Sequence, residues 1–344
     1  MVHKILVTGG AGFIGSALVR YLLREQNQVL ALDSLTYAGN LSSLPHPTSG
    51  SLYSFAQVNV CDTGRVDKIL EDFRPHWIIH LAAESHVDRS IDAPQSFIET
   101  NIVGTYTMLE AARHYWNTLP EADRQAFRFL HVPTDEVYGT ASQGESFTEA
   151  NPYNPSSPYA ASKAAADHLA RSWYKTFDLP VIVSNCSNNF GPFQFPEKLI
   201  PLAITNLMRG LSVPIYGDGS QVRDWLFVED HVRALHAVVE RGRPGETYIV
   251  GGGGEDCCNL DVVKAICAVM DKHVPLDAPH ERFIVFVADR LGHDIRYAVD
   301  STKIQKELGW VPEHGLAAAL EKTVAWYLEN TWWWTPLLQK RISC

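Results

Sequence analysis

The chain has 344 residues, of which 46% are hydrophobic, and its 29 basic and 39 acidic side chains give a formal net charge of −10. This length and apolar content supply a large core, whereas an acidic chain without basic runs is a poor candidate for binding nucleic acid. No apolar stretch reaches the roughly 18 residues of a membrane span, and Met1 leads into a strand rather than a signal peptide, so we expect a cytoplasmic protein without membrane contact.

The first segment predicts a dinucleotide site. An apolar strand over 4–7 precedes a glycine-rich loop and a helix over 16–24. The glycines are Gly9, Gly12 and Gly15. They permit a tight turn and close approach of a pyrophosphate to the helix start, and this ordered pattern disfavours a loop without function. The next strand, over 28–32, ends at Asp33, where a carboxylate would accept from both ribose hydroxyls and repel a 2′-phosphate, so the predicted cofactor is NAD.

Further strands and helices follow in alternation. A strand over 77–81 leads into small residues at 82–85, which would let the cofactor lie against the backbone. Thr100 and Asn101 are expected to open a helix, and another apolar strand covers 181–184. The alternation predicts an α/β fold with a Rossmann-type, doubly wound parallel sheet.

Two carboxylates follow a strand over 127–132, which ends near Pro133 because proline cannot donate to a sheet. Thr134, Asp135 and Glu136 therefore stand at the carboxyl end of a strand, where ligands bind in open α/β sheets. Successive side chains diverge there, so the two carboxyls could address neighbouring atoms of one substrate. The alternative for an isolated acidic pair is a solvated turn or a helix N-cap.

Tyr159 and Lys163 share one face of a predicted helix that begins near Pro158. A tyrosine with a pKa of about 10 is a poor base at neutral pH, and we expect the lysine to lower that pKa while it also binds a ribose hydroxyl. Tyrosine and lysine at this spacing also occur in ordinary amphipathic helices. Together with Asp135 and Glu136, however, this pair provides more acid and base groups than hydride transfer requires. The set therefore predicts an enzyme that also eliminates water.

The later chain predicts a second, smaller lobe. We expect a Rossmann domain over 1–184 with returning segments near 225–251, and a mixed α/β lobe over 185–344. A loop over 251–254 precedes a helix for which Asn259 is the expected N-cap. The scattered cysteines and histidines have no metal-ligand spacing, so no metal is predicted.

Six motifs resemble the extended short-chain dehydrogenase/reductases, and more narrowly the dTDP-glucose 4,6-dehydratases. They cover residues 8–15, 80–90, 134–139, 159–163, 187–192 and 216–225. The resemblance extends from about residue 3 to Pro312, and the Thr-Asp-Glu triplet is its most specific part. Pro133 stands where the family usually has serine, and Leu291 where it usually has proline.

The resemblance implies a dehydration mechanism. Tyr159, aided by Lys163 and Thr134, would take the proton of the sugar C4 hydroxyl while the C4 hydride passes to NAD. Glu136 would then remove the C5 proton and Asp135 would protonate the departing C6 hydroxyl. Return of the hydride to C6 would give a nucleotide-linked 4-keto-6-deoxyglucose.

The resemblance also implies the binding residues. The expected cofactor contacts are Gly9, Gly12, Phe13, Ile14, Gly15, Asp33, Ser34, Thr36, Asp62, Leu81, Ala82, Ala83, Ser85, Thr100, Tyr159, Lys163 and Asn189. The expected substrate contacts are Ser85, Thr134, Asp135, Glu136, Asn188, Lys198, Leu199, Pro214, Tyr216, Arg223, Asn259, Arg290 and His293. A homodimer through helices near 101–115 and 160–176 is implied as well.

Other functions stay open at this point. The nucleotide could be uridine rather than thymidine, and the fold also serves nucleotide-sugar epimerases and decarboxylases, although these do not need Asp135 with Glu136. A regulatory NAD-binding protein without catalysis is the non-enzymatic alternative, and such a protein would be expected to lose Tyr159 or Lys163.

Overall fold

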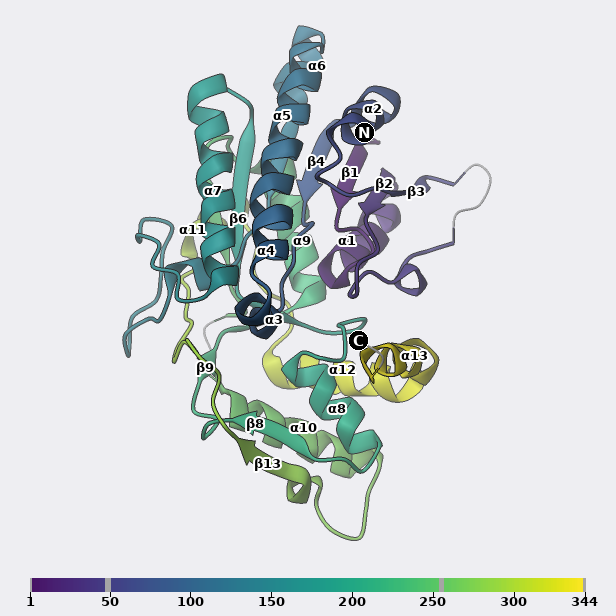
Figure 1. Cartoon of the computed structure of the whole chain (residues 1–344), viewed down its shortest axis with the longest axis vertical. Helices are drawn as coiled ribbons and strands as arrows, with labels where there is room; N and C mark the ends of the chain where they lie inside the picture. Colours follow the sequence, from purple (N-terminus) through teal and green to yellow (C-terminus); the bar gives the residue numbers. More distant parts are fainter. Residues whose placement is uncertain (1, 47–50, 254–256, 343–344) are drawn as a thin grey trace.

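The computed structural model describes residues 2–46, 51–253 and 257–342. Figure 1 shows a larger lobe, built on a sheet, above a smaller one. The sheet has seven strands in the order β11-β6-β5-β4-β1-β2-β3, and every neighbouring pair is parallel. In chain order the strands are β1 (Lys4–Thr8), β2 (Gln28–Asp33), β3 (Tyr53–Gln57), β4 (Trp77–His80), β5 (Arg128–His131), β6 (Val181–Cys186) and β11 (Thr247–Val250). The predicted α/β fold with a doubly wound parallel sheet is confirmed.

Helices bury both faces of this sheet, which is why its strands are almost continuously apolar. Ile5 and Val7 belong to one core, and Leu6, which points to the opposite face, belongs to the other. The helices of the first core are α1 (Phe13–Arg24), α9 (Val228–Arg241) and α11 (Thr302–Leu308). Those of the second are α2 (Thr63–Phe73), α5 (Gly104–Asn117) and α7 (Pro158–Phe177).

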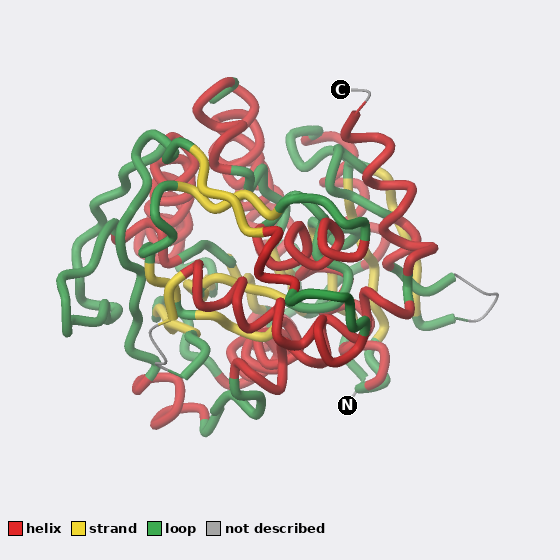
Figure 2. The backbone as a smooth tube through the Cα atoms, turned by 90° about the horizontal axis from the view of Figure 1, so that it is seen from below, coloured by secondary structure: helices red, strands yellow, loops and turns green. Residues whose placement is uncertain are grey.

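The smaller lobe packs its own helices around a third core. Figure 2 views the chain from below, from the side of this lobe. Its helices are α8 (Leu199–Met208), α10 (Asn259–His273), α12 (Leu316–Glu329) and α13 (Thr331–Ile342). Its short strand pairs are β8 (Val213–Tyr216) with β13 (Ile284–Val287), β9 (Val222–Arg223) with β12 (Cys257–Cys258), and β7 (Asn188–Phe190) with β10 (Trp225–Phe227).

Short helices of three to six residues complete the structure. They are η1 (Leu41–Ser43), α3 (Val87–Asp92), α4 (Gln95–Phe97), η2 (Ile98–Val103), α6 (Glu121–Ala126), η3 (Asp135–Tyr138) and η4 (His280–Phe283). No helix in the described part of the chain is both long and apolar enough to span a membrane.

Two helix starts differ from the predictions. Thr100 and Asn101 do not open a helix, because both lie inside the π-helical turn η2, which continues directly into α5. The buried Asn101 side chain bonds both backbone groups of Glu84, a long-range partner that the local pattern cannot reveal. Asn259 is the first residue of α10 rather than its N-cap, since the sulfur of Cys258 accepts from Asp261 N.

Two elements of the expected returning segments, α9 and β11, join the larger lobe. Strand β11 is an edge strand of the large sheet, and α9 packs against it. The expected boundary at residue 184 falls inside β6, and α11, which lay in the second predicted domain, packs on the first lobe. The division into 1–184 and 185–344 stays a prediction, and Gly254 in the expected 251–254 loop lies outside the described residues.

Candidate active site

The loop between β1 and α1 forms the floor of a cavity at the carboxyl edge of the sheet. Gly9 has a φ of +66°, and a Cβ there would lie 2.8 Å from the backbone nitrogen of Ala82. A side chain at Gly15 would collide with the carbonyl oxygen of Gly9. Among the described residues no side chain caps α1 at Gly12, so the positive end of this helix faces the cavity, as an anion site requires.

Asp33 stands where the prediction placed it, at the end of β2 and in the cavity wall. Its carboxylate accepts from Ala11 N at 3.0 Å and from Leu35 N at 2.8 Å. Burial raises the pKa of Asp33, and these backbone hydrogen bonds oppose the rise. The carboxylate is thereby fixed in place with acceptor capacity left for ribose hydroxyls.

One continuous cavity of about 540 Å³ brings almost all predicted site residues together. The cofactor residues that line it are Gly9, Gly12, Phe13, Ile14, Gly15, Asp33, Ser34, Thr36, Leu81, Ala82, Ala83, Ser85, Thr100, Tyr159, Lys163 and Asn189. The substrate residues are Ser85, Thr134, Glu136, Asn188, Lys198, Leu199, Pro214, Tyr216, Arg223, Asn259, Arg290 and His293. Two predicted residues do not line it. Asp62 caps α2 by accepting from Arg65 N at 3.2 Å, and Asp135 lies just behind the wall.

The Thr134-Asp135-Glu136 triplet begins the 3₁₀ turn η3 directly beyond β5. Thr134 is the N-cap of this turn, and its Oγ1 accepts from Glu136 N and donates to Asp135 Oδ1, both at 3.3 Å. The turn splits the two carboxyl groups, so that Glu136 lines the cavity while Asp135 is only 1% exposed. The two carboxyls diverge as predicted, but only Glu136 lines the cavity, whereas the prediction placed both against the substrate.

The two carboxyls differ in environment. Burial, followed by the negative charge of Glu136, raises the pKa of Asp135 well above its usual range. Burial also raises the pKa of Glu136, but the positive charges of Arg290 and Lys198 oppose that rise. Asp135 is therefore suited to hold a proton, whereas the positive charges near Glu136 favour the form that can accept one.

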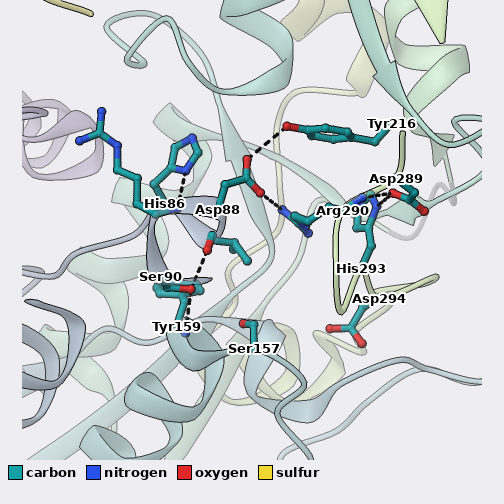
Figure 3. A network of polar contacts seen from close by, with 12 residues as sticks. His86, Asp88, Ser90, Ser157, Tyr159, Tyr216, Asp289, Arg290, His293 and Asp294 are labelled. Atoms are coloured by element: carbon teal, nitrogen blue, oxygen red, sulfur yellow. Dashed lines mark hydrogen bonds and ion pairs between the residues drawn. The ribbon is translucent and has the colours of Figure 1, made fainter. Parts of the chain in front are cut away.

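Helix α7 carries Tyr159 and Lys163 into the same cavity. Ser157 caps the helix by accepting from Ala160 N at 3.1 Å, and Pro158 stands in the first turn. Tyr159 N donates to Ser90 Oγ at 3.2 Å, a contact drawn in Figure 3 that fixes the helix start against α3. Both functional side chains are buried in the cavity wall.

The expected effect of the lysine on the tyrosine is not found in the protein alone. Burial, followed by the charge of Glu136, raises the pKa of Tyr159 well above its usual value instead of lowering it. Lys163 Nζ donates to the carbonyl of Val132 at 3.1 Å. The prediction of a lowered pKa for Tyr159 was wrong, because it considered the helical spacing and neglected the loss of hydration of the phenol.

Cationic groups gather in the cavity where the smaller lobe meets α3. Figure 3 shows Asp88 between Tyr216 and Arg290. Tyr216 OH donates to Asp88 Oδ2 at 3.3 Å, and Arg290 Nη1 lies 3.7 Å from Asp88 Oδ1. His293 Nδ1 lies 2.7 Å from Asp289 Oδ1. Asp88 thus connects the two lobes across the cavity, a role that sequence reasoning missed.

Asp294 and Tyr297 were also missed. Asp294 accepts from Thr140 Oγ1 and from Tyr297 OH, each at 2.7 Å, and from Ser156 Oγ. Tyr297 OH lies 3.4 Å from Glu136 Oε2. Through these contacts, residues near 294–297 fix the position of Glu136. The contacts join residues up to 161 positions apart, so no local sequence pattern predicts them.

Arg89 joins three segments over the cavity. Its guanidinium lies 3.7 Å from the ring centre of Tyr37, and its Nη2 lies 3.4 Å from Glu197 Oε2. Tyr37 and Glu197 line the cavity, whereas Arg89 does not, and Glu197 directly precedes Lys198. The contact therefore holds the cofactor-side loop near Tyr37 against the loop that carries a predicted substrate residue.

The two departures from the family pattern are structurally mild. Pro133 lines the cavity, and its carbonyl accepts from the sulfur of Cys186 at 3.5 Å. The next residue, Thr134, forms a parallel bridge with Cys186, so the main chain stays paired with β6. Leu291 is 77% exposed. Among the described residues, no group of three or more His, Cys, Asp or Glu side chains is placed to hold a metal ion.

The C-terminal tryptophans divide between packing and exposure. Trp333 and Trp334 are buried in the core of the smaller lobe, whereas Trp332 is 59% exposed. Trp333 Nε1 also donates to Ser43 Oγ of the larger lobe at 3.0 Å.

Comparison with known proteins agrees with this site. The model of a family described as GDP-mannose 4,6 dehydratase matches residues 6–323. The dTDP-glucose 4,6-dehydratase of Neisseria meningitidis serogroup B is 54% identical over 343 residues, which cover 98% of this chain and 96% of the relative. The dTDP-glucose 4,6-dehydratase DesIV of Streptomyces venezuelae, crystallised with NAD and TYD bound, is 44% identical with a TM-score of 0.87 and covers 97% of this chain and 99% of that one.

A solved structure with a different activity is more distant in sequence. The UDP-glucose 4-epimerase of Thermus thermophilus, in complex with NAD, is 29% identical with a TM-score of 0.84, over 95% of this chain and 99% of that chain. The fold is thus shared with epimerases, whereas the level of identity separates the two groups. This chain therefore belongs to the GDP-mannose 4,6 dehydratase family and, within it, stands among the dTDP-glucose 4,6-dehydratases.

Proposed function

We propose that this protein converts dTDP-glucose to dTDP-4-keto-6-deoxyglucose with a tightly bound NAD. The observation that carries the proposal is the buried Asp135 beside the cavity-lining Glu136, in a cavity that also contains Tyr159 and Lys163. An epimerase needs one oxidation and one reduction at a single carbon. A 4,6-dehydratase also needs an acid and a base for the loss of water, and this site has both.

The cavity fits NAD in three respects. The glycine loop leaves no room for a Cβ at Gly9 or Gly15, so the backbone can approach a pyrophosphate. The start of α1 presents its positive end to that position. Asp33 is held for the ribose hydroxyls by two backbone donors. When bound, NAD supplies the oxidant for C4 and afterwards the reductant for C6.

Tyr159 and Thr134 would handle the C4 hydroxyl. A hydrogen bond with Thr134 lowers the pKa of Tyr159, in opposition to burial and to the charge of Glu136. Lys163 would stabilise the phenolate and hold a ribose hydroxyl, because its Nζ lines the same wall with only one carbonyl partner among the described residues. The C4 ketone that results would make the C5 proton more acidic.

Elimination would then use the carboxyl pair. Glu136, beside the positive charges of Arg290 and Lys198, would remove the C5 proton. Asp135, whose pKa is raised well above its usual range by burial, would donate a proton to the C6 hydroxyl as it leaves. Elimination thus takes one proton from the sugar and returns one to the departing water.

The smaller lobe would hold the nucleotide diphosphate. Arg223, Arg290 and Lys198 all line the cavity, and planar guanidinium groups suit phosphate oxygens. Tyr216 and Asn259 lie in the same wall, at the end of β8 and the start of α10, where they would contact the base. The diphosphate would compete with Asp88 for Arg290.

Asp33→Ala is expected to weaken NAD binding and to relax discrimination against NADP, because the carboxylate that accepts from the ribose and repels a 2′-phosphate is lost. The affinity for each cofactor, measured by calorimetry on protein freed of nucleotide, checks this. Asp62→Ala is the control, since Asp62 caps α2 outside the cavity. Unchanged cofactor preference in Asp33→Ala would mean that another residue reads the ribose.

Incubation of the purified protein with dTDP-glucose and, separately, with UDP-glucose tests the proposal. The absorbance that alkali develops with 4-keto-6-deoxy sugars should rise with dTDP-glucose and much less with UDP-glucose. A similar rise with UDP-glucose would assign the enzyme to uridine nucleotides. The appearance of a C4 epimer without loss of water would favour the epimerase, and no change of either sugar would favour a non-catalytic protein.

We further propose that the protein forms a homodimer through η2, α5 and α7. Ile98, Val103, Tyr106 and Phe177 expose large apolar side chains along these helices, and the rings of Tyr106 and Trp173 meet edge to face at 5.9 Å. Sedimentation equilibrium should give the mass of two chains. The cytoplasmic location and the absence of nucleic-acid or membrane partners stay predictions from composition.

A further inference from the structure

A buried acidic residue, Asp167, follows Tyr159 and Lys163 on helix α7. Asp167 stands four residues beyond Lys163, so the three side chains lie in succession along one face of the helix. Asp167 is 0% exposed and does not line the cavity. A buried carboxylate is costly unless it is paired, so its partners indicate what it does.

The partners of Asp167 come from three different segments. Tyr153 OH donates to its Oδ2 at 2.6 Å, and Asn185 Nδ2 donates to the same oxygen at 3.3 Å. His131 Nε2 lies 3.0 Å from its Oδ1. The carboxylate is therefore fixed by groups from β5, β6 and the loop before α7.

One of these partners also holds the backbone of the catalytic segment, and another is adjacent to it in the chain. Asn185 Nδ2 donates to the carbonyl of Thr134 at 3.2 Å as well as to Asp167. His131 directly precedes Val132, whose carbonyl accepts from Lys163 Nζ at 3.1 Å. Asp167 thus contacts both sides of the catalytic apparatus, the helix and the strand end.

Among the charged and titratable groups around Lys163, Asp167 is the carboxyl group, although the two side chains form no ion pair within the described part of the chain. Those groups are His80 on β4, His131 on β5, Cys186 on β6, and Tyr159 and Asp167 on α7, while Arg171 acts on His131. Burial raises the pKa of Tyr159 well above its usual value, so the phenol keeps its proton. Burial lowers the pKa of both histidines, so they are neutral at neutral pH. Burial raises the pKa of the Cys186 thiol to about 12, so the thiol keeps its proton. Arg171 donates to Tyr153 OH at 2.6 Å and brings no negative charge.

We propose that Asp167 is a positioning residue for Lys163: its buried carboxylate keeps Nζ charged and holds α7 in place against the backbone of residues 132–134. Burial lowers the pKa of Lys163, and the charge of Asp167 is the first influence that opposes this. The inference deepens the proposed function, on which it rests, because a charged Lys163 is what would stabilise the Tyr159 phenolate.

Asp167→Asn tests the proposal by a change in the titration of Lys163. An acylating reagent reacts with the free amine, so the rate of Lys163 acylation against pH, followed by mass spectrometry, reports its pKa without any need for activity. We expect the midpoint to fall by about one pH unit or more, which makes acylation near neutral pH roughly tenfold faster. The alkaline limb of NADH formation with dTDP-glucose should move to lower pH by a similar amount, since charged lysine is lost as pH rises through its pKa.

Matched variants separate charge from structure. Tyr153→Phe removes a hydrogen bond to the same carboxylate but keeps its charge, so the midpoint should stay in place. Asp167→Glu should restore a midpoint close to that of the unaltered protein, and Asp167→Ser offers a second neutral side chain if the asparagine variant does not fold. An unshifted midpoint in a folded neutral variant, or an equal shift in Tyr153→Phe, would overturn the proposal. Failure of the unaltered enzyme to dehydrate dTDP-glucose, with the acylation shift intact, would refute the proposed function alone.

Discussion

Glu136→Gln is expected to let dTDP-glucose reduce the bound NAD and then to stall before water leaves. The amide cannot accept the C5 proton, whereas oxidation at C4 depends on Tyr159 and Lys163, which stay in the cavity wall. Loss of a general base costs roughly 10²–10⁴-fold in rate. Mixing enzyme with substrate should therefore give a rise in NADH absorbance that persists, with almost no 4-keto-6-deoxy sugar by alkali development.

The exposed Glu145 supplies the control for this variant. Glu145→Gln makes the same chemical change outside the cavity and should keep full activity. A Glu136→Gln enzyme that dehydrates at the normal rate would refute the assignment of Glu136 as the C5 base. One that fails to form NADH would place Glu136 in the oxidation step instead.

Glu136→Gln should also lower the pKa of the neighbouring Asp135. The charge of Glu136 is the second cause, after burial, that raises the pKa of Asp135. Because the two carboxyls influence each other, the pH profile of elimination belongs to the pair rather than to either group. Elimination by the unaltered enzyme requires Glu136 ionised and Asp135 protonated, so its rate should fall at low pH as Glu136 gains a proton and at high pH as Asp135 loses one.

Tyr159→Phe is expected to abolish the first oxidation, so that neither NADH nor product forms. The phenol is the group positioned to take the C4 hydroxyl proton, and its removal should reduce the rate by roughly 10²–10⁴-fold. Stopped-flow absorbance of NADH in a single turnover measures this directly. Substrate affinity should change little, because Arg223 and Arg290, which would hold the diphosphate, are unaltered in this variant.

Tyr138→Phe is the matched control for Tyr159→Phe. Tyr138 is as well buried and lies two residues after Glu136, but it does not line the cavity. It should therefore form NADH at nearly the normal rate. Unimpaired NADH formation by Tyr159→Phe would show that another group accepts the hydroxyl proton.

The predictable parts of this protein are those encoded by neighbouring residues. The strand, glycine loop, helix and Asp33 occur in order within one βαβ unit, and the structure places them as expected. The triplet at 134–136 and the pair Tyr159 and Lys163 were also readable, because a strand end and a helical spacing fix where such side chains point. Their union in one cavity follows from the parallel sheet.

Other features depend on contacts that are remote in sequence. Asp88 meets Tyr216 and Arg290 only when the lobes come together, and Tyr297 reaches Glu136 from 161 positions away. The π-helical turn η2 surrounds a buried Asn101 that bonds Glu84, which helix propensity cannot foresee.

The direction of the pKa shift of Tyr159 was missed for a related reason. Desolvation depends on the whole fold, whereas the expected influence of Lys163 came from local spacing alone. The same fold-wide packing brings Asp167 against β5 and β6, from where it would keep that lysine charged.

Transfer of a label from C4 tests most directly whether oxidation and loss of water occur in one closed site. dTDP-glucose with deuterium at C4 should yield a 4-keto-6-deoxy product that carries the deuterium in its C6 methyl group, as mass spectrometry and NMR would show. Deuterium retained at C4 of a glucose or galactose product, or product whose methyl group is unlabelled, would contradict the account.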